Sequence, residues 1–259
     1  MTHVLLIPNV GWPRLLARAR RLEELGVETV WVDDHALNPA HPAQPWLDAW
    51  SVLSALAAAT SRLRLGPLVA NGVLRAPAVL ARHALSVDHI SGGRLELGLG
   101  AGYAASDHAA AGTTPRPDRL AELVTTVAAA LREEPAIDGY PPLAPVERRI
   151  PLTIAAHGRR ALHVAARYAD RWVSYGGFGL DTATHLAVTA ERIAVLDEAS
   201  AGRKVRRMLL AGSPAVTAEP IWRSVAAVTD FVGRYRELGI DEFTFYYQDS
   251  AVFEDYLTT

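Results

Sequence analysis

The 259-residue sequence contains no cysteine, which excludes disulfide bonds, thiol catalysis and thiolate metal sites. Lysine is nearly absent, since Lys204 is the only one. No run approaches the roughly 20 apolar residues that a membrane-spanning helix requires. Residues 1–8 also lack the basic region and the long apolar core of a signal peptide. We therefore expect no membrane association, and a cytoplasmic location is the default expectation.

The chain also has little net charge. Its formal value is −2 at pH 7, with acidic and basic residues scattered along the sequence, so neither nucleic acid nor an acidic membrane surface is expected as a partner. Half of the residues are hydrophobic, and a chain of this length can build one large core. No linker, low-complexity tract or repeat is evident. The sequence therefore predicts a single domain over residues 1–259.

Short apolar stretches alternate with amphipathic ones along the chain. The former predict strands at residues 4–8, 29–32, 63–69, 94–99, 151–155, 171–174, 205–210 and 243–247. The latter predict helices at residues 13–25, 46–60, 77–90, 118–133, 159–169, 182–199, 224–238 and 252–257. Eight such pairs predict an α/β fold of the (β/α)8 TIM-barrel type, with a doubly wound open sheet as the alternative. In a barrel, functional residues lie on the loops that leave the carboxyl ends of the strands.

Glycines occupy alternate positions where the fourth predicted strand ends, at Gly98, Gly100 and Gly102. Glycine at alternate strand positions usually means that another group lies close against the backbone. That group is either a neighbouring strand or a flat ligand, and spacing alone leaves both open. A dinucleotide-binding fingerprint is disfavoured, because no helix follows at once and the Gly-x-Gly-x-x-Gly register is missing.

Two kinds of barrel chemistry are also disfavoured. A Schiff-base enzyme needs a lysine at the catalytic face, but Lys204 precedes the seventh predicted strand and belongs to the opposite end. A metal centre needs several convergent ligands. Asp33, Asp34 and His35 are the only cluster, and adjacent residues at a strand end cannot all face one ion. We therefore predict no metal site.

Three features favour a bound aromatic cofactor with an anionic group. The glycines at the end of the fourth predicted strand leave space for a flat ring system. The turn of small residues at 155–158 leads directly into a predicted helix, whose free N–H groups and dipole attract phosphate. Arg159 or Arg160 either adds positive charge there or is a solvated helix residue. His35 ends the second strand, where an imidazole can move a proton at neutral pH; alternatively, it only hydrogen-bonds its neighbours.

Five segments resemble one protein family. They are Val32–His35, Arg64–Val69, Pro77–His83, Ile90–Tyr103 and Ala165–Trp172. Together they resemble the luciferase-like flavin monooxygenase superfamily, particularly its branch that uses the deazaflavin coenzyme F420. The resemblance covers nearly the whole chain in the correct order. It implies a compact luciferase-like (β/α)8 barrel that holds its flavin at the C-terminal mouth.

By motif, the resemblance implies that His35, beside Asp34, is the acid–base residue near the reactive ring. Relatives have a non-proline cis peptide at the position of Leu68–Val69. The residues implied to bind the cofactor are Leu68, Val69, Asn71, Gly100, Ala101, Gly102 and Tyr103, and those implied to hold its phosphate are Ala156, His157, Gly158 and Arg159. Members of the family commonly form homodimers, so the resemblance implies a homodimer here.

The departures from the family pattern concern the substrate side. The excursion between the seventh strand and its helix is shortened to residues 211–220, so the substrate pocket is expected to be open or completed by a partner. Tyr103 replaces the Trp or acidic residue often found there, and Asp107 stands near a frequent Glu.

Three hypotheses about function follow. The first is an oxidoreductase that transfers a hydride between reduced F420 and a small organic substrate, with His35 exchanging the accompanying proton. The second is an FMN-dependent monooxygenase of the same superfamily. The third is a flavin-binding protein without turnover. The sequence leaves the substrate and the direction of the reaction open.

Overall fold

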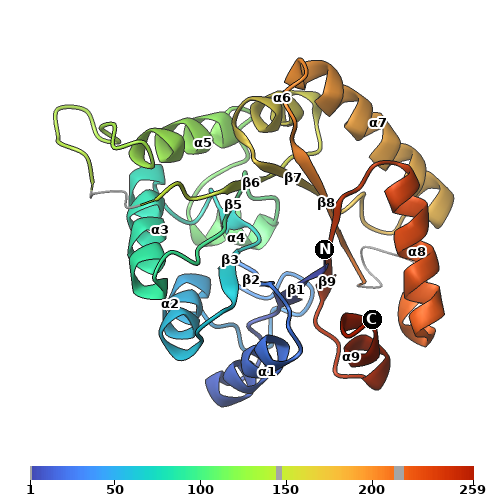
Figure 1. Cartoon of the computed structure of the whole chain (residues 1–259). Coiled ribbons are helices and arrows are strands. Elements are labelled where there is room, and N and C mark those ends of the chain that lie inside the picture. Colours follow the sequence, from blue (N-terminus) through green and yellow to red (C-terminus); the bar gives the residue numbers. More distant parts are fainter. Residues whose placement is uncertain (1, 144–147, 213–218) are drawn as a thin grey trace.

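A computed structural model describes residues 2–143, 148–212 and 219–259 (Figure 1). Parallel strands form a nearly closed barrel in the order β3-β2-β1-β9-β8-β7-β6-β5-β4. The strands are β1 Thr2–Leu6, β2 Thr29–Val32, β3 Arg64–Pro67, β4 Ala70–Asn71, β5 Leu97–Gly100, β6 Leu152–Ala155, β7 Arg171–Ser174, β8 Arg206–Ala211 and β9 Glu242–Tyr246. The open-sheet alternative is thereby excluded.

Strands β3 and β4 are two halves of one barrel strand. They are separated by Leu68 and Val69, which are joined by a cis peptide bond, so the cis peptide that the resemblance implied is confirmed. β4 pairs with β5, and an isolated bridge between Leu65 and Leu95 joins β3 to the segment that precedes β5. The barrel therefore has the eightfold repeat that the sequence predicts.

Helices surround the barrel (Figure 1). In the described residues they are α1 Trp12–Glu24, α2 Ala49–Ala59, α3 Pro77–Ser91, α4 Ala105–Ala110, α5 Arg119–Ala130, α6 Arg159–Tyr168, α7 Thr182–Ser200, the 3₁₀ turn η1 Ile221–Arg223, α8 Val225–Glu237 and α9 Ala251–Leu257. No helix in this part of the chain is long and apolar enough to cross a membrane.

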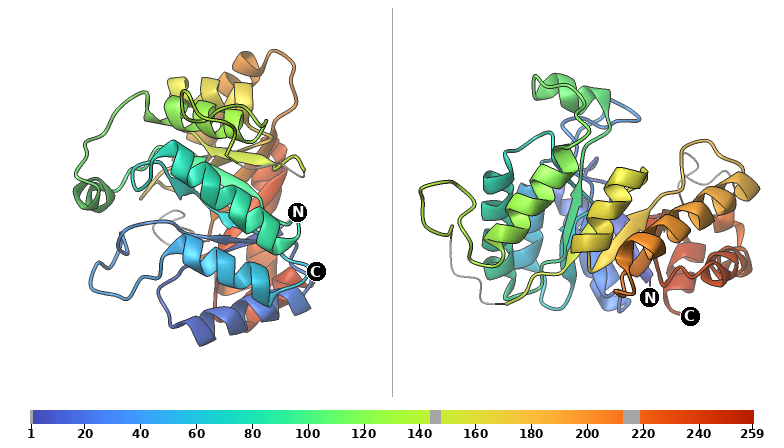
Figure 2. Two further views of the ribbon diagram at one scale, coloured as in Figure 1. Left: turned by 90° about the vertical axis from the view of Figure 1, so that its left-hand side faces the viewer. Right: turned by 90° about the horizontal axis from the view of Figure 1, so that it is seen from above.

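Two helices depart notably from the sequence prediction. Helix α2 begins three residues later than the predicted start at Trp46, because the Asp48 side chain caps it by accepting a hydrogen bond from the Ser51 backbone N–H. Helix α4 lies where the sequence predicts a loop, and it stands apart from the ring of other helices (Figure 2). Of the shortened connection at 211–220, residues 213–218 lie outside the described residues.

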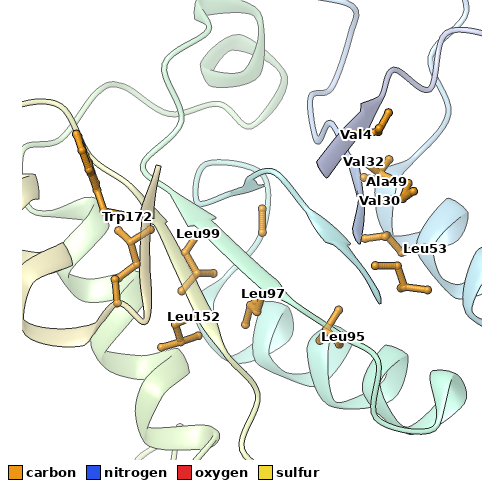
Figure 3. Close-up of a cluster of buried hydrophobic side chains, with 14 of the residues drawn as sticks. Val4, Val30, Val32, Ala49, Leu53, Leu95, Leu97, Leu99, Leu152 and Trp172 are labelled. Atoms are coloured by element: carbon orange, nitrogen blue, oxygen red, sulfur yellow. The ribbon is translucent and has the colours of Figure 1, made fainter. Parts of the chain in front are cut away.

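The strands bury side chains on both faces. Val4, Val30 and Val32 point outward against the helices, in a core that also includes Leu97 (Figure 3). Their neighbours fill the inside of the barrel, where an apolar layer consists of Leu5, Trp31, Leu68, Val173 and Met208. Because side chains alternate along a strand, the inward position after Trp31 is Asp33. The backbone N–H of Asp33 still bonds Leu6 O, so the strand pattern continues into the first residues of the loop.

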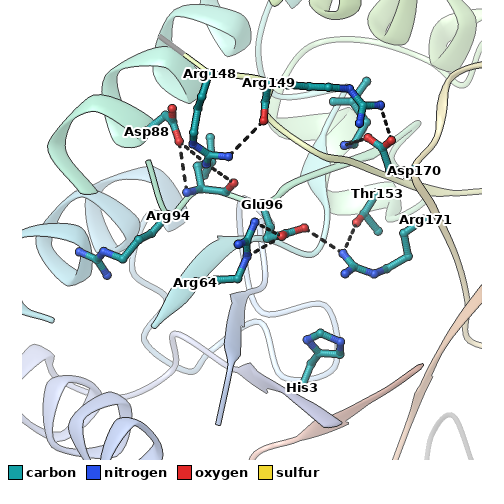
Figure 4. A network of polar contacts seen from close by, with 12 residues as sticks. His3, Arg64, Asp88, Arg94, Glu96, Arg148, Arg149, Thr153, Asp170 and Arg171 are labelled. Atoms are coloured by element: carbon teal, nitrogen blue, oxygen red, sulfur yellow. Dashed lines mark hydrogen bonds and ion pairs between the residues drawn. The ribbon is translucent and has the colours of Figure 1, made fainter. Parts of the chain in front are cut away.

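Charged side chains fill the opposite end of the barrel, where the strands begin (Figure 4). Arg171 is 2% exposed; its Nε donates to Glu242 Oε2 at 2.6 Å and its Nη1 to Glu96 Oε2 at 3.0 Å. His3 Nε2 also donates to Glu242, at 2.9 Å. We call His3, Glu96, Arg171 and Glu242 the basal ionic layer. Its place at the N-terminal face indicates a role in stability.

The alternate glycines of β5 are explained by this packing. A Cβ atom added at Gly98 would lie 2.2 Å from the Pro67 carbonyl oxygen, and one added at Gly100 would lie 2.4 Å from Val69 Cγ2. At Gly102 the same atom would meet Asn71 Oδ1 at 2.4 Å. The neighbouring barrel strand therefore lies against these glycines. This corrects the interpretation that they leave space for a flat ring.

Candidate active site

A cavity of about 900 Å³ opens at the carboxyl ends of the strands. This is the end at which barrel enzymes place their active sites, and the volume is in the range of cofactor and ligand pockets. The cavity is lined by most residues that the resemblance implied, namely Asp34, His35, Leu68, Val69, Asn71, Gly100, Ala101, Gly102, Tyr103, Ala156, His157 and Arg159. Gly158 is the exception: it is the N-cap of α6 and does not line the cavity.

His35 is held at the edge of this cavity by Asp107. Its Nδ1 donates to Asp107 Oδ2 at 2.7 Å, and its side chain is 8% exposed. Burial alone would lower the pKa of His35. The hydrogen bond to Asp107 and the negative charges of Asp33, Asp107 and Asp34 outweigh burial, so the pKa is raised. A carboxylate on Nδ1 fixes the tautomer and leaves Nε2 to exchange protons.

Asp107 is itself held by several donors. Its carboxylate accepts hydrogen bonds from the Ala36 backbone N–H at 2.8 Å and from Asn71 Nδ2 at 2.6 Å, besides that from His35. Burial would raise the pKa of Asp107, but these hydrogen bonds and the charge of His35 lower it, so the side chain is an anion. Asp107 lies on α4, which the sequence did not predict. The sequence signal that could have indicated Asp107 is that it stands near a position where relatives often have Glu.

Asp34 is hydrogen-bonded to groups other than His35. Both oxygens of its carboxylate accept hydrogen bonds from Arg75 Nη1, at 3.0 and 2.9 Å, and Oδ2 also accepts one from the Asn71 backbone N–H at 2.9 Å. It follows Asp33 by one residue and therefore points to the other side of the strand. The carboxylate bonded to His35 is therefore that of Asp107, while Asp34 fixes Arg75 and Asn71. A catalytic role for Asp34 stays a prediction.

The far end of the cavity meets the start of α6. Arg159 and Arg160 both line it. Arg159 Nη2 also contacts Glu198 at 3.2 Å in an exposed ion pair. Exposed pairs of this kind are weak, so either arginine is able to meet an anion. The free N–H groups of the first helical turn have the same preference.

His157 lines this end without adding positive charge. Burial lowers its pKa to about 3, and the nearby Arg192 acts in the same direction. Its Nε2 accepts a hydrogen bond from the Tyr175 backbone N–H at 3.4 Å. The imidazole is therefore neutral at pH 7, and its partner is the loop that follows β7.

Aromatic side chains form the rim of the cavity. The Tyr103 ring packs edge-on against His35, with centroids 5.5 Å apart, and lies 5.8 Å from Phe178. Tyr175 in turn lies 4.8 Å from Phe178. Tyr103 is 57% exposed and Phe178 is 48% exposed, so apolar surface faces solvent at the entrance. Exposed aromatic surface beside a cavity favours an apolar ligand.

The described residues contain no group of three or more His, Asp or Glu side chains arranged to hold a metal ion. The reactive groups of the mouth are therefore an imidazole, its carboxylates and the anion-attracting end of α6. The imidazole–carboxylate pair thus lies at the C-terminal mouth of a parallel barrel, where barrel enzymes place their catalytic groups.

Comparison with known families identifies the kind of barrel enzyme. The chain belongs to the luciferase-like monooxygenase family, whose sequence model matches residues 3–235. The resemblance found from the sequence motifs is thereby confirmed. Membership makes the chain an oxidoreductase enzyme of this family.

Individual relatives cover most of the chain. An uncharacterized protein of Mycobacterium tuberculosis is 30% identical in an alignment that covers 88% of this chain and 85% of that protein. The F420-dependent hydroxymycolic acid dehydrogenase of the same organism is 28% identical. The alignment covers 84% of this chain and 65% of that dehydrogenase. A solved F420-dependent secondary alcohol dehydrogenase, in complex with an F420–acetone adduct, matches with a TM-score of 0.82. It covers 100% of this chain and 99% of its own at 16% identity, which shows a common fold.

Proposed function

We propose that this chain is an F420-dependent oxidoreductase that transfers a hydride between the deazaflavin and an uncharged alcohol or carbonyl compound. The observation that carries the proposal is the His35–Asp107 pair at the edge of a cavity large enough for a flavin. The two dehydrogenases described above are F420-dependent, which supports the choice of cofactor.

The residues of the cavity suit such a cofactor. Leu68, Val69 and Ala155 present an apolar wall on which a planar ring can lie, and Ala156 and Arg160 line the end that is suited to its anionic tail. When bound, the deazaflavin supplies the carbon atom that accepts or gives the hydride. We assign the ring to the side of Val69 and the anionic tail to the start of α6.

His35 exchanges the proton that accompanies the hydride. In alcohol oxidation the Nε2 lone pair accepts the hydroxyl proton, and Asp107 stabilises the resulting imidazolium through Nδ1–H. In the reverse direction Nε2 returns that proton to the carbonyl oxygen. Apolar side chains, including Leu5 and Leu210, also line the cavity. They favour an uncharged substrate.

An FMN-dependent monooxygenase is the second candidate, because the family model is named for that activity. The single-domain organisation, the homodimer and the cytoplasmic location stay predictions from the sequence.

Titration of the purified protein with F420 and, separately, with FMN tests the proposal, with fluorescence as the readout. We expect tight binding of F420, followed by its reduction when uncharged secondary alcohols are added. Tight binding of FMN alone would favour the monooxygenase. Binding of F420 without turnover across alcohols, aldehydes and enones would favour a protein that binds flavin only.

A further inference from the structure

Asp33 is a third carboxylate at the mouth of the barrel, and the proposed function gives it no role. It occupies the inward position after Trp31 on the extension of β2 and lines the cavity. Its Oδ1 lies 3.4 Å from His35 Nε2, and its side chain is 16% exposed. The imidazole is thus placed between two carboxylates, with Asp107 at Nδ1 and Asp33 at Nε2.

The three carboxylates differ in what surrounds them. Asp34 is neutralised by Arg75, and Asp107 accepts three hydrogen bonds. Within residues 2–143, 148–212 and 219–259, no arginine or lysine pairs with Asp33. Asp33 is therefore the carboxylate of the three that is best suited to take up a proton.

The groups that face Asp33 come from several elements. His35 and Asp34 lie on the same loop, and Asp107 lies on α4. Tyr103 follows β5 and Tyr246 ends β9, and both phenols are electrostatically coupled to Asp33. Burial raises the pKa of Asp33 to about 6, with His35 opposing and the neighbouring carboxylates reinforcing the change. The pKa of His35 is raised as well, and the 3.4 Å between its Nε2 and Asp33 Oδ1 places the two groups for proton transfer.

We propose that Asp33 receives the substrate proton from His35 Nε2, so that Asp107, His35 and Asp33 form one proton relay that ends in the cavity. This inference rests on the proposed function. In alcohol oxidation the hydroxyl proton passes to Nε2 and then to Asp33 Oδ1. The C–H electron pair leaves with its hydrogen for the deazaflavin, and the carbonyl double bond forms. Reduction runs through the same atoms in reverse. Asp33 acts through His35, which alone exchanges the proton with the substrate oxygen.

The relay makes a prediction for the protein without cofactor. We expect Asp33→Asn to lower the pKa of His35 by about one unit, because a negative charge near Nε2 is lost. Asp33→Glu keeps the charge and is expected to keep the raised pKa. The pKa is measured by NMR titration of protein labelled with ¹⁵N-histidine, and the His35 signals are assigned by their loss in His35→Gln. Asp249→Asn, at an exposed site paired with Arg14, serves as the matched control and is expected to change nothing.

The same variants are then compared in alcohol oxidation with F420. We expect Asp33→Asn to lower kcat at least tenfold, with the acid limb of the pH profile moved to lower pH and the F420 Kd unchanged; Asp33→Glu should recover most of the activity. An unchanged His35 pKa in a folded Asp33→Asn protein would overturn the relay. Because the NMR titration needs no cofactor, a lowered pKa in a protein that fails to bind F420 counts against the proposed function alone.

Discussion

The roles of Asp33, Asp34 and His35 follow from which way each side chain points. The three adjacent residues are predicted as a cluster by sequence, and the resemblance assigns His35 and Asp34 to catalysis. Strand alternation continues past Val32, so that Asp33 and His35 point to the same side of the strand, while Asp34 points to the other side and bonds Arg75. Counting inward positions from Trp31 would have indicated Asp33. The partner Asp107 lies 72 residues away from His35, and only the fold brings the two together.

Removal of the imidazole tests the proton-transfer role. We expect His35→Ala to lower kcat by about 10²- to 10⁴-fold, which is the usual contribution of a general acid–base group. The F420 Kd should change little, because the ring and the anionic tail are assigned to other residues. His41→Ala, an exposed histidine of the same loop, is the matched control and should behave as wild type. Equal losses in turnover and affinity would make His35 a structural residue. Steady-state kinetics and fluorescence titration separate these outcomes.

At the scale of elements, β5 shows how one sequence signal permits two interpretations. The alternate glycines of the strand correctly predict a close approach, and a protein strand rather than a ligand makes it. The spacing of the glycines alone could not decide this, because it does not show which segment lies beside them.

A methyl group at Gly98 tests the close approach. Its backbone does not have a positive φ, so the expected cost comes from the overlap with the Pro67 carbonyl and the tight contact with Val69 Cγ1 at 3.2 Å. We expect Gly98→Ala to lower the free energy of unfolding by about 1–3 kcal/mol. Gly233→Ala is the control, since Gly233 lies within α8 with no atom within 4 Å of an added Cβ. That change should stabilise the protein by about 0.5–1 kcal/mol. Urea unfolding measures both, and equal effects would contradict the packing explanation.

Helix α6 permits a matched test of the end of the cavity to which the anionic tail of the cofactor is assigned. Arg160 lines the cavity, while Arg167 lies exposed two turns further along the same helix. We expect Arg160→Glu to weaken F420 binding at least tenfold, because a negative charge would face the anionic tail. Arg167→Glu makes the same change of charge and should leave the affinity unaltered. Similar losses in both variants would point to a general electrostatic effect. The two Kd values, measured at low and high salt, decide the matter.

At the scale of the whole molecule, the sequence is sufficient to predict the barrel. Periodicity locates all eight strand–helix pairs, because each strand is a short apolar run and each long helix has one apolar face. It misses α4, whose six residues are too few to show a period. It also gives no sign of the basal ionic layer. The members of this layer are far apart in the chain, and each lies in or next to a predicted strand, namely His3, Glu96, Arg171 and Glu242.

The basal ionic layer makes stability depend on pH. Burial would raise the pKa of Glu242, but hydrogen bonding to His3 and the charges of Arg171 and Arg206 lower it to about 2. In the unfolded chain the pKa of the Glu242 carboxyl is near its ordinary value of about 4.5. The stabilisation that the ionised Glu242 carboxylate provides is therefore complete above about pH 4.5 and is lost as the pH falls towards 2.

We expect Glu242→Gln to lower the free energy of unfolding by about 3 kcal/mol at pH 7, with the difference shrinking between pH 4.5 and 2. Glu254→Gln removes an exposed partner of Arg21 and should cost about 1 kcal/mol or less. Urea unfolding at several pH values measures both changes. A pH-independent loss in Glu242→Gln would show that shape rather than charge stabilises this end.

The apolar layer inside the barrel separates two sets of charges with different tasks. Five side chains, Leu5, Trp31, Leu68, Val173 and Met208, stand between the carboxylates that hold the fold and those assigned to proton exchange. Because the two sets of charges are separated, the loops at the carboxyl ends of the strands can change without disturbing the basal ionic layer. Natural or directed evolution can therefore exchange residues around the cavity entrance to accept new substrates while the other end of the barrel stays unaltered.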